Sequence, residues 1–142
     1  MDFFTALKIS GSGLSAERTR VNLASSNLAN AETTRGPNGQ PYQRLDPVFQ
    51  AVAMEANNAA QPGAETAKGV EVSQVVADTT PGKRVYSPGH PDADPDGFVT
   101  FPNVNPVNEV VNLLSASRGY EANATAVETL KQMAQRGLDI SR

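Results

Sequence analysis

The sequence predicts an α+β fold, in which a long helix at each end of the chain flanks a small, irregular β-rich middle. All ten prolines lie between Pro37 and Pro106, so the first 36 and the last 36 residues contain none. Because proline in a helix interior costs about 3 kcal/mol, each end is free to form a long helix. Apolar residues also recur every seven positions at both ends, a spacing typical of coiled coils.

The N-terminal helix is predicted by a narrow apolar seam. The seam consists of four residues spaced by seven: Leu7, Leu14, Val21 and Leu28. Small or polar residues lie between them, which would allow a partner helix to come close. Gly11 and Gly13 weaken this helix, since each glycine costs about 0.5–1 kcal/mol relative to alanine. We therefore expect it to need a partner.

The C-terminal helix is predicted to run from Pro106 to about Leu138. Asn105 can cap it, Pro106 suits the first helical position, and Glu109 suits the positive end of the helix dipole. Its seam residues are Leu113, Tyr120, Val127 and Leu130. Two helices with such seams favour ordered assembly between subunits, and a helical hairpin within one chain fits the same pattern.

Between the helices, short stretches of alternating or β-branched residues predict four strands, within residues 42–52, 69–78, 83–87 and 97–101. A mobile loop is expected near residues 55–69, which are rich in Ala, Gly and Pro. The predicted organisation is therefore a helical assembly domain, residues 1–34 plus 104–142, and a small β-rich outer domain, residues 35–103.

The composition argues against a large core. Leu, Ile, Val and Phe number 30 of 142 residues, and 19 of the hydrophobic residues are alanine. Burial of so little apolar surface barely offsets the conformational entropy lost on folding. The net charge of −3 is too small to keep the chain unfolded by repulsion. We expect marginal stability alone, with further stability supplied by neighbouring subunits.

Several function classes lack support. The absence of cysteine excludes disulfides, thiol chemistry and cysteine-based metal sites. No apolar run approaches the roughly 18 residues of a membrane span, and the N-terminus lacks a cleaved secretory signal. Basic residues are scattered, which argues against nucleic-acid binding. We find no catalytic constellation, so the expectation is a protein that is not an enzyme and has no cofactor or metal.

The turn "DADPDG" is the one candidate cation site. Asp92, Asp94 and Asp96 match the first half of a calcium-binding EF-hand loop, which makes a small calcium-binding module an alternative function. The twelfth loop position, however, is Asn103 instead of glutamate, and strand-like residues follow instead of a helix. A turn that uses Pro, Asp and Gly for their geometry is the favoured interpretation.

The stretch "SSNLANAETTRG" carries the most specific signal. It ends the N-terminal helix with two asparagines around a leucine, and the motif "SNLANxxT" resembles the signature of bacterial flagellar axial proteins of the rod and hook class. The motif residues are Ser26, Asn27, Leu28, Ala29, Asn30 and Thr33. Residues 1–44 and 85–142, including "PGHPDADPDG", resemble the C-type proximal rod proteins of this class.

This resemblance implies a structural subunit of the proximal rod of the flagellar basal body. The two helices would pair and pack with neighbours into a tube, which surrounds the export channel and transmits torque. The implied partners are copies of the chain, other rod proteins, ring or export-gate adaptor proteins and the flagellar type III export apparatus. The implied location is the periplasm-spanning rod, reached by export without a cleaved signal.

Phe3 and Leu7 fit the spacing of a short export-recognition element found in early substrates of that apparatus. The alternative is that both are simply the first apolar residues of the helix seam.

Overall fold

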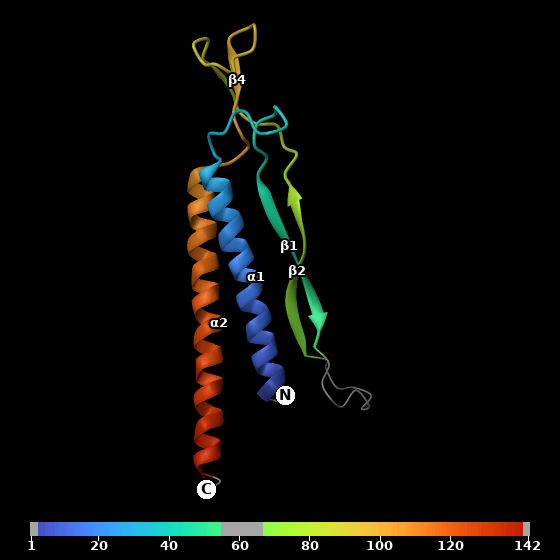
Figure 1. Cartoon of the computed structure of the whole chain (residues 1–142), viewed down its shortest axis with the longest axis vertical. Helices are drawn as coiled ribbons and strands as arrows, with labels where there is room; N and C mark the ends of the chain where they lie inside the picture. The colour runs from blue at the N-terminus through green and yellow to red at the C-terminus, as the bar shows by residue number, and fades with distance from the viewer. Residues whose placement is uncertain (1–2, 55–66, 141–142) are drawn as a thin grey trace. The chain divides into compact units, whose positions relative to one another are not determined.

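The computed structural model describes residues 3–54 and 67–140 (Figure 1). The elements in chain order are helix α1 (Phe3–Ala29), strands β1 (Leu45–Ala53), β2 (Lys68–Ala77), β3 (Arg84–Tyr86) and β4 (Phe98–Thr100), and helix α2 (Pro106–Ile140). Strand β1 pairs with β2, and β3 pairs with β4. The α+β prediction is therefore confirmed, and every predicted strand overlaps an observed one. Most of the predicted loop, residues 55–66, lies outside the described residues.

Helix α2 begins where the sequence predicts. The side-chain oxygen of Asn105 accepts hydrogen bonds from the backbone N–H of Val107 (3.0 Å) and of Asn108 (3.4 Å). These bonds satisfy two of the N–H groups that a helix start leaves without partners. Pro106 occupies the first helical position, where its missing N–H costs nothing.

The chain divides into two compact units, and each unit contains part of both helices. Unit 1 comprises Met1–Thr19, Val48–Gln74 and Ser115–Arg142. Unit 2 comprises Arg20–Pro47 and Val75–Leu114.

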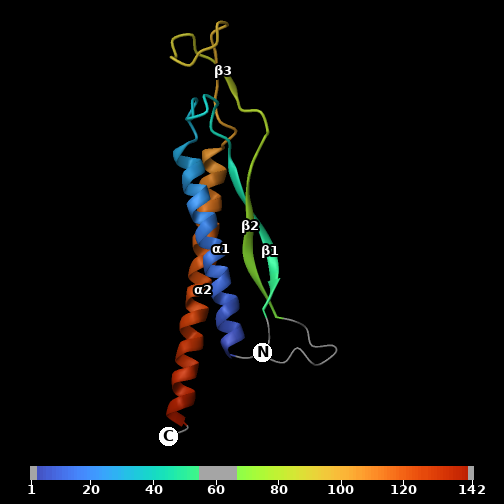
Figure 2. The ribbon, with the colours of Figure 1, turned by 45° about the vertical axis from the view of Figure 1, so that its right-hand side comes forward.

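In unit 1, glycines allow α1 and α2 to lie close together (Figure 2). A Cβ atom placed on Gly13 of α1 would lie only 2.8 Å from the side-chain oxygen of Asn123 on α2. In the other direction, a Cβ on Gly119 of α2 would lie 2.8 Å from a carboxylate oxygen of Glu17 on α1. Each helix thus offers a notch to a polar side chain of the other, and Gly13, which weakens α1 in isolation, makes the pairing possible.

Strand β2 is attached to α1 within the same unit. The Ser12 hydroxyl donates to the carbonyl of Ile9 (2.7 Å) and accepts from the backbone N–H of Val70 (3.1 Å). Gly69 is buried next to Ser12. The serine therefore ties the start of β2 to the helix by a hydrogen bond that strand pairing alone would not provide.

The buried core is small, as the composition predicts. Among the described residues, the buried hydrophobic side chains are Ala16, Ala24, Val99 and Ala116. Full burial of a valine is worth about 1.5–3 kcal/mol and alanine contributes less, so these residues stabilise the chain only modestly. Thirteen large hydrophobic side chains of the described residues are exposed. Much apolar surface is therefore left for contacts outside the chain.

Helix α1 turns a face of small and polar residues inward. Its buried positions are Thr5, Gly13, Ala16, Ala24 and Asn27. At 100° per residue, the centre of this face lies about 120° around the helix from the predicted seam. All four seam residues, from Leu7 to Leu28, are consequently only half-buried.

Candidate functional site

The motif at the end of α1 stops the helix by hydrogen bonding. Asn30 donates twice to the carbonyl of Ser26, from its backbone N–H (3.0 Å) and from its side-chain amide (2.9 Å). Its side-chain oxygen accepts from the Thr33 hydroxyl (3.2 Å). Leu28 is half-buried and Ala29, the last helical residue, is exposed. Asn30 and Thr33 thus satisfy polar groups at the helix end and in the turn beyond it.

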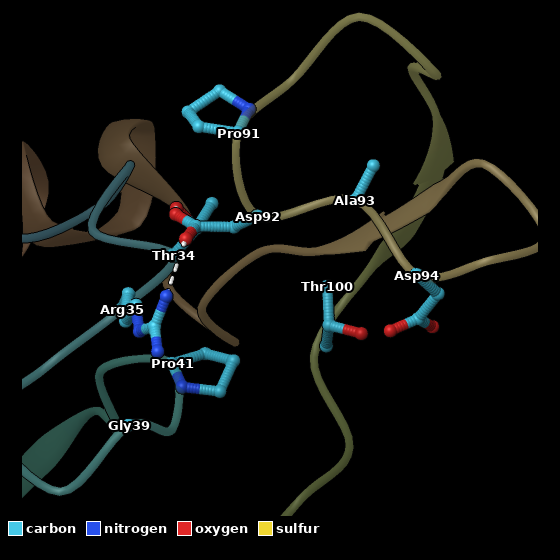
Figure 3. Close-up of a pocket in the computed structure, with 9 residues that line it drawn as sticks. All are labelled: Thr34, Arg35, Gly39, Pro41, Pro91, Asp92, Ala93, Asp94 and Thr100. Atoms are coloured by element: carbon cyan, nitrogen blue, oxygen red, sulfur yellow. Dashed lines mark hydrogen bonds and ion pairs between the residues drawn. The ribbon is translucent and has the colours of Figure 1, made fainter.

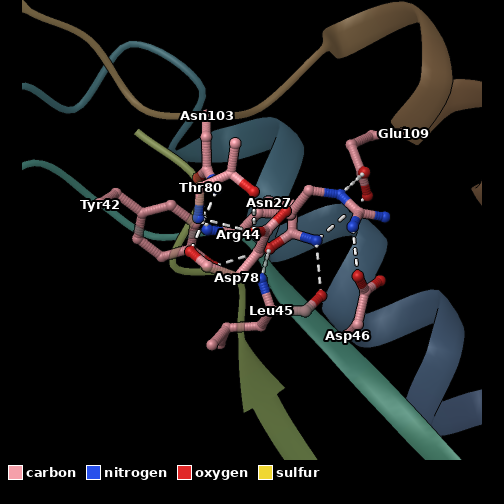
Figure 4. Close-up of polar contacts among 9 residues, drawn as sticks. All are labelled: Asn27, Tyr42, Arg44, Leu45, Asp46, Asp78, Thr80, Asn103 and Glu109. Atoms are coloured by element: carbon pink, nitrogen blue, oxygen red, sulfur yellow. Dashed lines mark hydrogen bonds and ion pairs between the residues drawn. The ribbon is translucent and has the colours of Figure 1, made fainter. Parts of the chain in front are cut away.

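Asn27 has a different role, because it is buried within unit 2 with 1% of its surface exposed. Its amide nitrogen donates to the carbonyl of Leu45 (2.9 Å) and to a carboxylate oxygen of Glu109 (3.1 Å). Its amide oxygen accepts from the N–H of Leu45 (2.9 Å) and from the hydroxyl of Tyr42 (2.9 Å). Figure 4 shows these contacts. Both donors and both acceptor positions of the amide are used.

Glu109 is the buried acid of this group, with 1% of its surface exposed. One carboxylate oxygen accepts from Asn27, and the other accepts from Nε of Arg44 at 2.6 Å. The guanidinium also contacts Asp46. Burial opposes the positive charge of Arg44, but its hydrogen bond to Glu109 and the charges of Asp46 and Glu109 outweigh burial and raise its pKa. The buried carboxylate therefore has a matched, permanently charged partner.

We call Asn27, Tyr42, Arg44, Leu45 and Glu109 the Asn27–Glu109 cluster. They come from the end of α1, the segment that enters β1 and the first turn of α2, so the cluster joins three parts of unit 2. A buried polar group without its partner costs about 1–3 kcal/mol, and a buried charge costs more. Any shift of one segment against the others would incur such costs, which fixes their relative register.

A ring of backbone and side-chain bonds supports the cluster from one side. The N–H of Arg44 donates to the side-chain oxygen of Asn103 (3.0 Å), whose amide donates to the carbonyl of Asp78 (3.1 Å). The N–H of Asp78 donates back to the carbonyl of Arg44 (2.8 Å). The Asp78 carboxylate accepts from the hydroxyl (2.6 Å) and N–H (2.9 Å) of Thr80, and these two bonds lower its pKa.

The sequence pointed to Asn27 but not to its partners. Tyr42 and Arg44 lie in a stretch predicted only as a strand, and Glu109 was assigned only a helix-dipole role. An arginine within a predicted strand, followed by an acidic residue at the start of a helix, is too common a pattern to predict a buried pair.

The "DADPDG" turn connects β3 and β4, as predicted. Gly97 has a φ of +80°, which favours glycine, and its N–H donates to the carbonyl of Asp94 (2.8 Å). Asp92 accepts from the Thr34 hydroxyl (2.7 Å) and lies 3.6 Å from Arg35, at a pocket of about 300 Å³ (Figure 3).

The turn's carboxylates are thus engaged by the chain's own groups. Asp94 pairs with Arg84 at 3.3 Å. No three His, Asp or Glu side chains in the described parts of the chain are grouped so as to hold a metal ion. The calcium-binding alternative finds no support, and Asp96 is an exposed turn residue.

The structure places the predicted packing residues on partly open helix surfaces. On α2, Leu113, Val127 and Leu130 are half-buried, and Tyr120 is exposed. Phe3 and Leu7, the candidate export element, are both half-buried in the first turns of α1. Within residues 3–54 and 67–140, neither helix combines the length and apolar character that crossing a membrane requires.

Two family descriptions match the chain. "Flagella basal body rod protein" matches residues 7–37, and "Flagellar basal body rod FlgEFG protein C-terminal" matches residues 96–140. The first covers most of α1 and the motif that ends it. The second covers β4, the entry to α2 and α2 itself.

Full-length relatives agree with these matches. The chain is 45% identical over 142 residues to the flagellar basal-body rod protein FlgC of Escherichia coli O6:H1, with both chains fully covered. It is 42% identical over 142 residues to FlgC of Yersinia enterocolitica, and 38% identical over 150 residues to FlgC of Bacillus subtilis, again over the whole of both chains. The chain therefore belongs to the FlgC family of flagellar basal-body rod proteins.

Proposed function

We propose that this chain, a structural subunit of the flagellar basal-body rod, assembles into the proximal rod by packing its terminal helices against those of neighbouring subunits. Subunits joined in this way would form a drive shaft that transmits torque and surrounds the export channel. Its mechanism is mechanical, and it is not an enzyme. Its neighbours would be copies of itself, other rod proteins and the adaptor proteins of the basal ring and export gate.

The observation that carries this proposal is the partial burial of the helix seams. The seam residues of α1 and three of the four on α2 are half-buried, while the intrachain face of α1 is built from smaller residues. The proposed packing residues on α1 are Leu7, Leu14, Val21 and Leu28, and those on α2 are Leu113, Tyr120, Val127 and Leu130. With so small a core, burial against neighbours would add stability by mass action.

The proposed division of labour follows from the same surfaces. Residues 1–34 and 104–142 would form the helical assembly domain, and residues 35–103 the outer domain. The Asn27–Glu109 cluster would hold the start of that outer region in a fixed register on the helices.

Export would use the type III apparatus, with Phe3 and Leu7 as the recognition element. Phe3→Ala should lower the amount of this protein secreted into the medium of a strain that cannot assemble rods. Phe4→Ala is the matched control, because Phe4 is exposed and lies outside the proposed spacing. Equal secretion of the two variants would leave Phe3 with a packing role only.

Charge placed on the seam tests the assembly proposal. Leu28→Asp or Val127→Asp should abolish swimming and leave basal bodies without a complete rod, because an unpaired carboxylate would be buried between helices. Ala29→Asp is the control beside Leu28, since Ala29 is exposed. Immunoblots would establish that each variant is synthesised and exported. Normal swimming of the Leu28 and Val127 variants would refute packing through these seams.

A further inference from the structure

The first two turns of α2 carry an apolar surface that the chain itself does not cover. Val107 is 70% exposed, Val110 42%, Val111 59% and Leu114 54%. Their spacing of three, four and seven residues places them on one side of a helix. We call these four residues the α2 stripe.

The α2 stripe lies away from the intrachain contact. Glu109 and Ala116, on the same stretch of helix, are 1% and 0% exposed. At 100° per residue, the middle of the stripe is about 160° around the helix from these two residues. Packing within the chain therefore does not require the stripe, and a contiguous apolar face of this kind marks an interaction site.

A polar pocket of about 460 Å³ borders the stripe. Val111 belongs to both, and the other lining residues are Arg44, Asp78, Asn103, Asn105, Asn108, Glu109 and Asn112. Two carboxylates and one guanidinium line this pocket, and the guanidinium already contacts Glu109 and, beside the pocket, Asp46. The border of the stripe thus carries net negative charge, with the Asp78 carboxylate accessible.

We propose that the α2 stripe docks the C-terminal helix of a neighbouring rod subunit, through an apolar ridge with a lysine or arginine that reaches the pocket at Asp78. This inference rests on the proposed function. A helix is the occupant that suits a stripe spanning two helical turns, and a basic side chain complements the charge at its border.

The C-terminal helix of this class has the required chemistry, as α2 itself demonstrates. Met133 and Leu138 near its end are 64% and 68% exposed, and Lys131 and Arg136 are exposed among them. The description that matches residues 96–140 names the C-terminal part of several flagellar proteins, so a helix of this kind is not confined to this chain.

Photo-cross-linking in assembled basal bodies tests the inference. The photoreactive amino acid p-benzoylphenylalanine would replace Val111 or Leu114 in the full chain, in cells whose swimming shows that the rod is complete. After irradiation, basal bodies would be purified and the cross-linked peptides identified by mass spectrometry. The same probe at Tyr86, an exposed aromatic residue of β3, is the control.

The expected product joins the stripe to a peptide from the C-terminal helix of a rod subunit, while Tyr86 gives no such product. Asp78→Asn should lower the yield of that product by up to about five-fold, the range for an exposed ion pair. Cross-links from the stripe to an N-terminal helix, a strand region or a ring protein, or no cross-link in swimming cells, would overturn the inference and leave the proposed function intact. Absence of the unsubstituted chain from basal bodies would instead overturn both.

Discussion

Substitution of Gly13 by alanine probes how closely the two helices approach in unit 1. In a helix interior, alanine is favoured over glycine by about 0.5–1 kcal/mol. Gly11, two residues earlier, has no atom within 4 Å of a Cβ placed on it. Gly11→Ala should therefore raise the free energy of unfolding by about 0.5–1 kcal/mol, which makes it the matched control.

At Gly13 the same methyl group meets Asn123. Its Cβ would lie 2.8–2.9 Å from the oxygen, carbon and nitrogen of the side-chain amide. That amide is held in place, because its nitrogen donates to the carbonyl of Gly119 at 2.9 Å. Losing this bond costs about 0.5–1.5 kcal/mol and overpacking about 1–3 kcal/mol. After subtraction of the propensity gain, Gly13→Ala should lower stability by about 1–3 kcal/mol.

Urea unfolding followed by circular dichroism at 222 nm would measure both variants. A double-mutant cycle adds a sharper test, since Asn123→Ala removes the atoms that the new methyl group meets. In that background Gly13→Ala should change sign and become stabilising. If Gly13→Ala and Gly11→Ala stabilise the protein equally, the close approach at Gly13 is refuted.

Two further predictions concern charges in unit 2. Arg44→Met should lower the free energy of unfolding by about 3–5 kcal/mol, because Glu109 would remain buried without its cation; Arg84→Met, which removes an exposed ion pair, should cost no more than about 1 kcal/mol, and equal effects in urea titrations would contradict the buried pairing. Thr80→Val should raise the pKa of Asp78 in an NMR titration, because a hydroxyl donor is lost. Since the folded pKa is depressed, the parent's advantage should be present above about pH 4 and vanish as the pH falls through the folded pKa, and an unchanged titration would contradict this role of Thr80.

Local sequence signals located most of the elements correctly. The cap at Asn105 and the proline after it fixed the start of α2 because both act on the backbone within a few residues. The same holds for the turn with Gly97, where a positive φ and a nearby carbonyl are local matters. Heptad spacing predicted two helices, but it did not predict which side of α1 faces α2.

That side was decided by residues far apart in the chain. Gly13 looks like a flaw in a helix until Asn123 is placed beside it, and Asn27 gains its meaning from Glu109, 82 residues away. Neither pairing leaves a mark in the spacing of residues along one segment. Small side chains can be buried where helices approach closely, so the most apolar face need not be the inner one.

The sequence by itself determined where this chain forms helices, strands and turns, and its motifs indicated the protein class before any contact was known. These properties depend on backbone preferences and on neighbours within a few positions. Only the tertiary structure decided that Asn27 and Glu109 share a buried cluster with Arg44, and that the α2 stripe stays exposed. The physical reason is that burial and pairing of a polar group depend on which distant segments surround it.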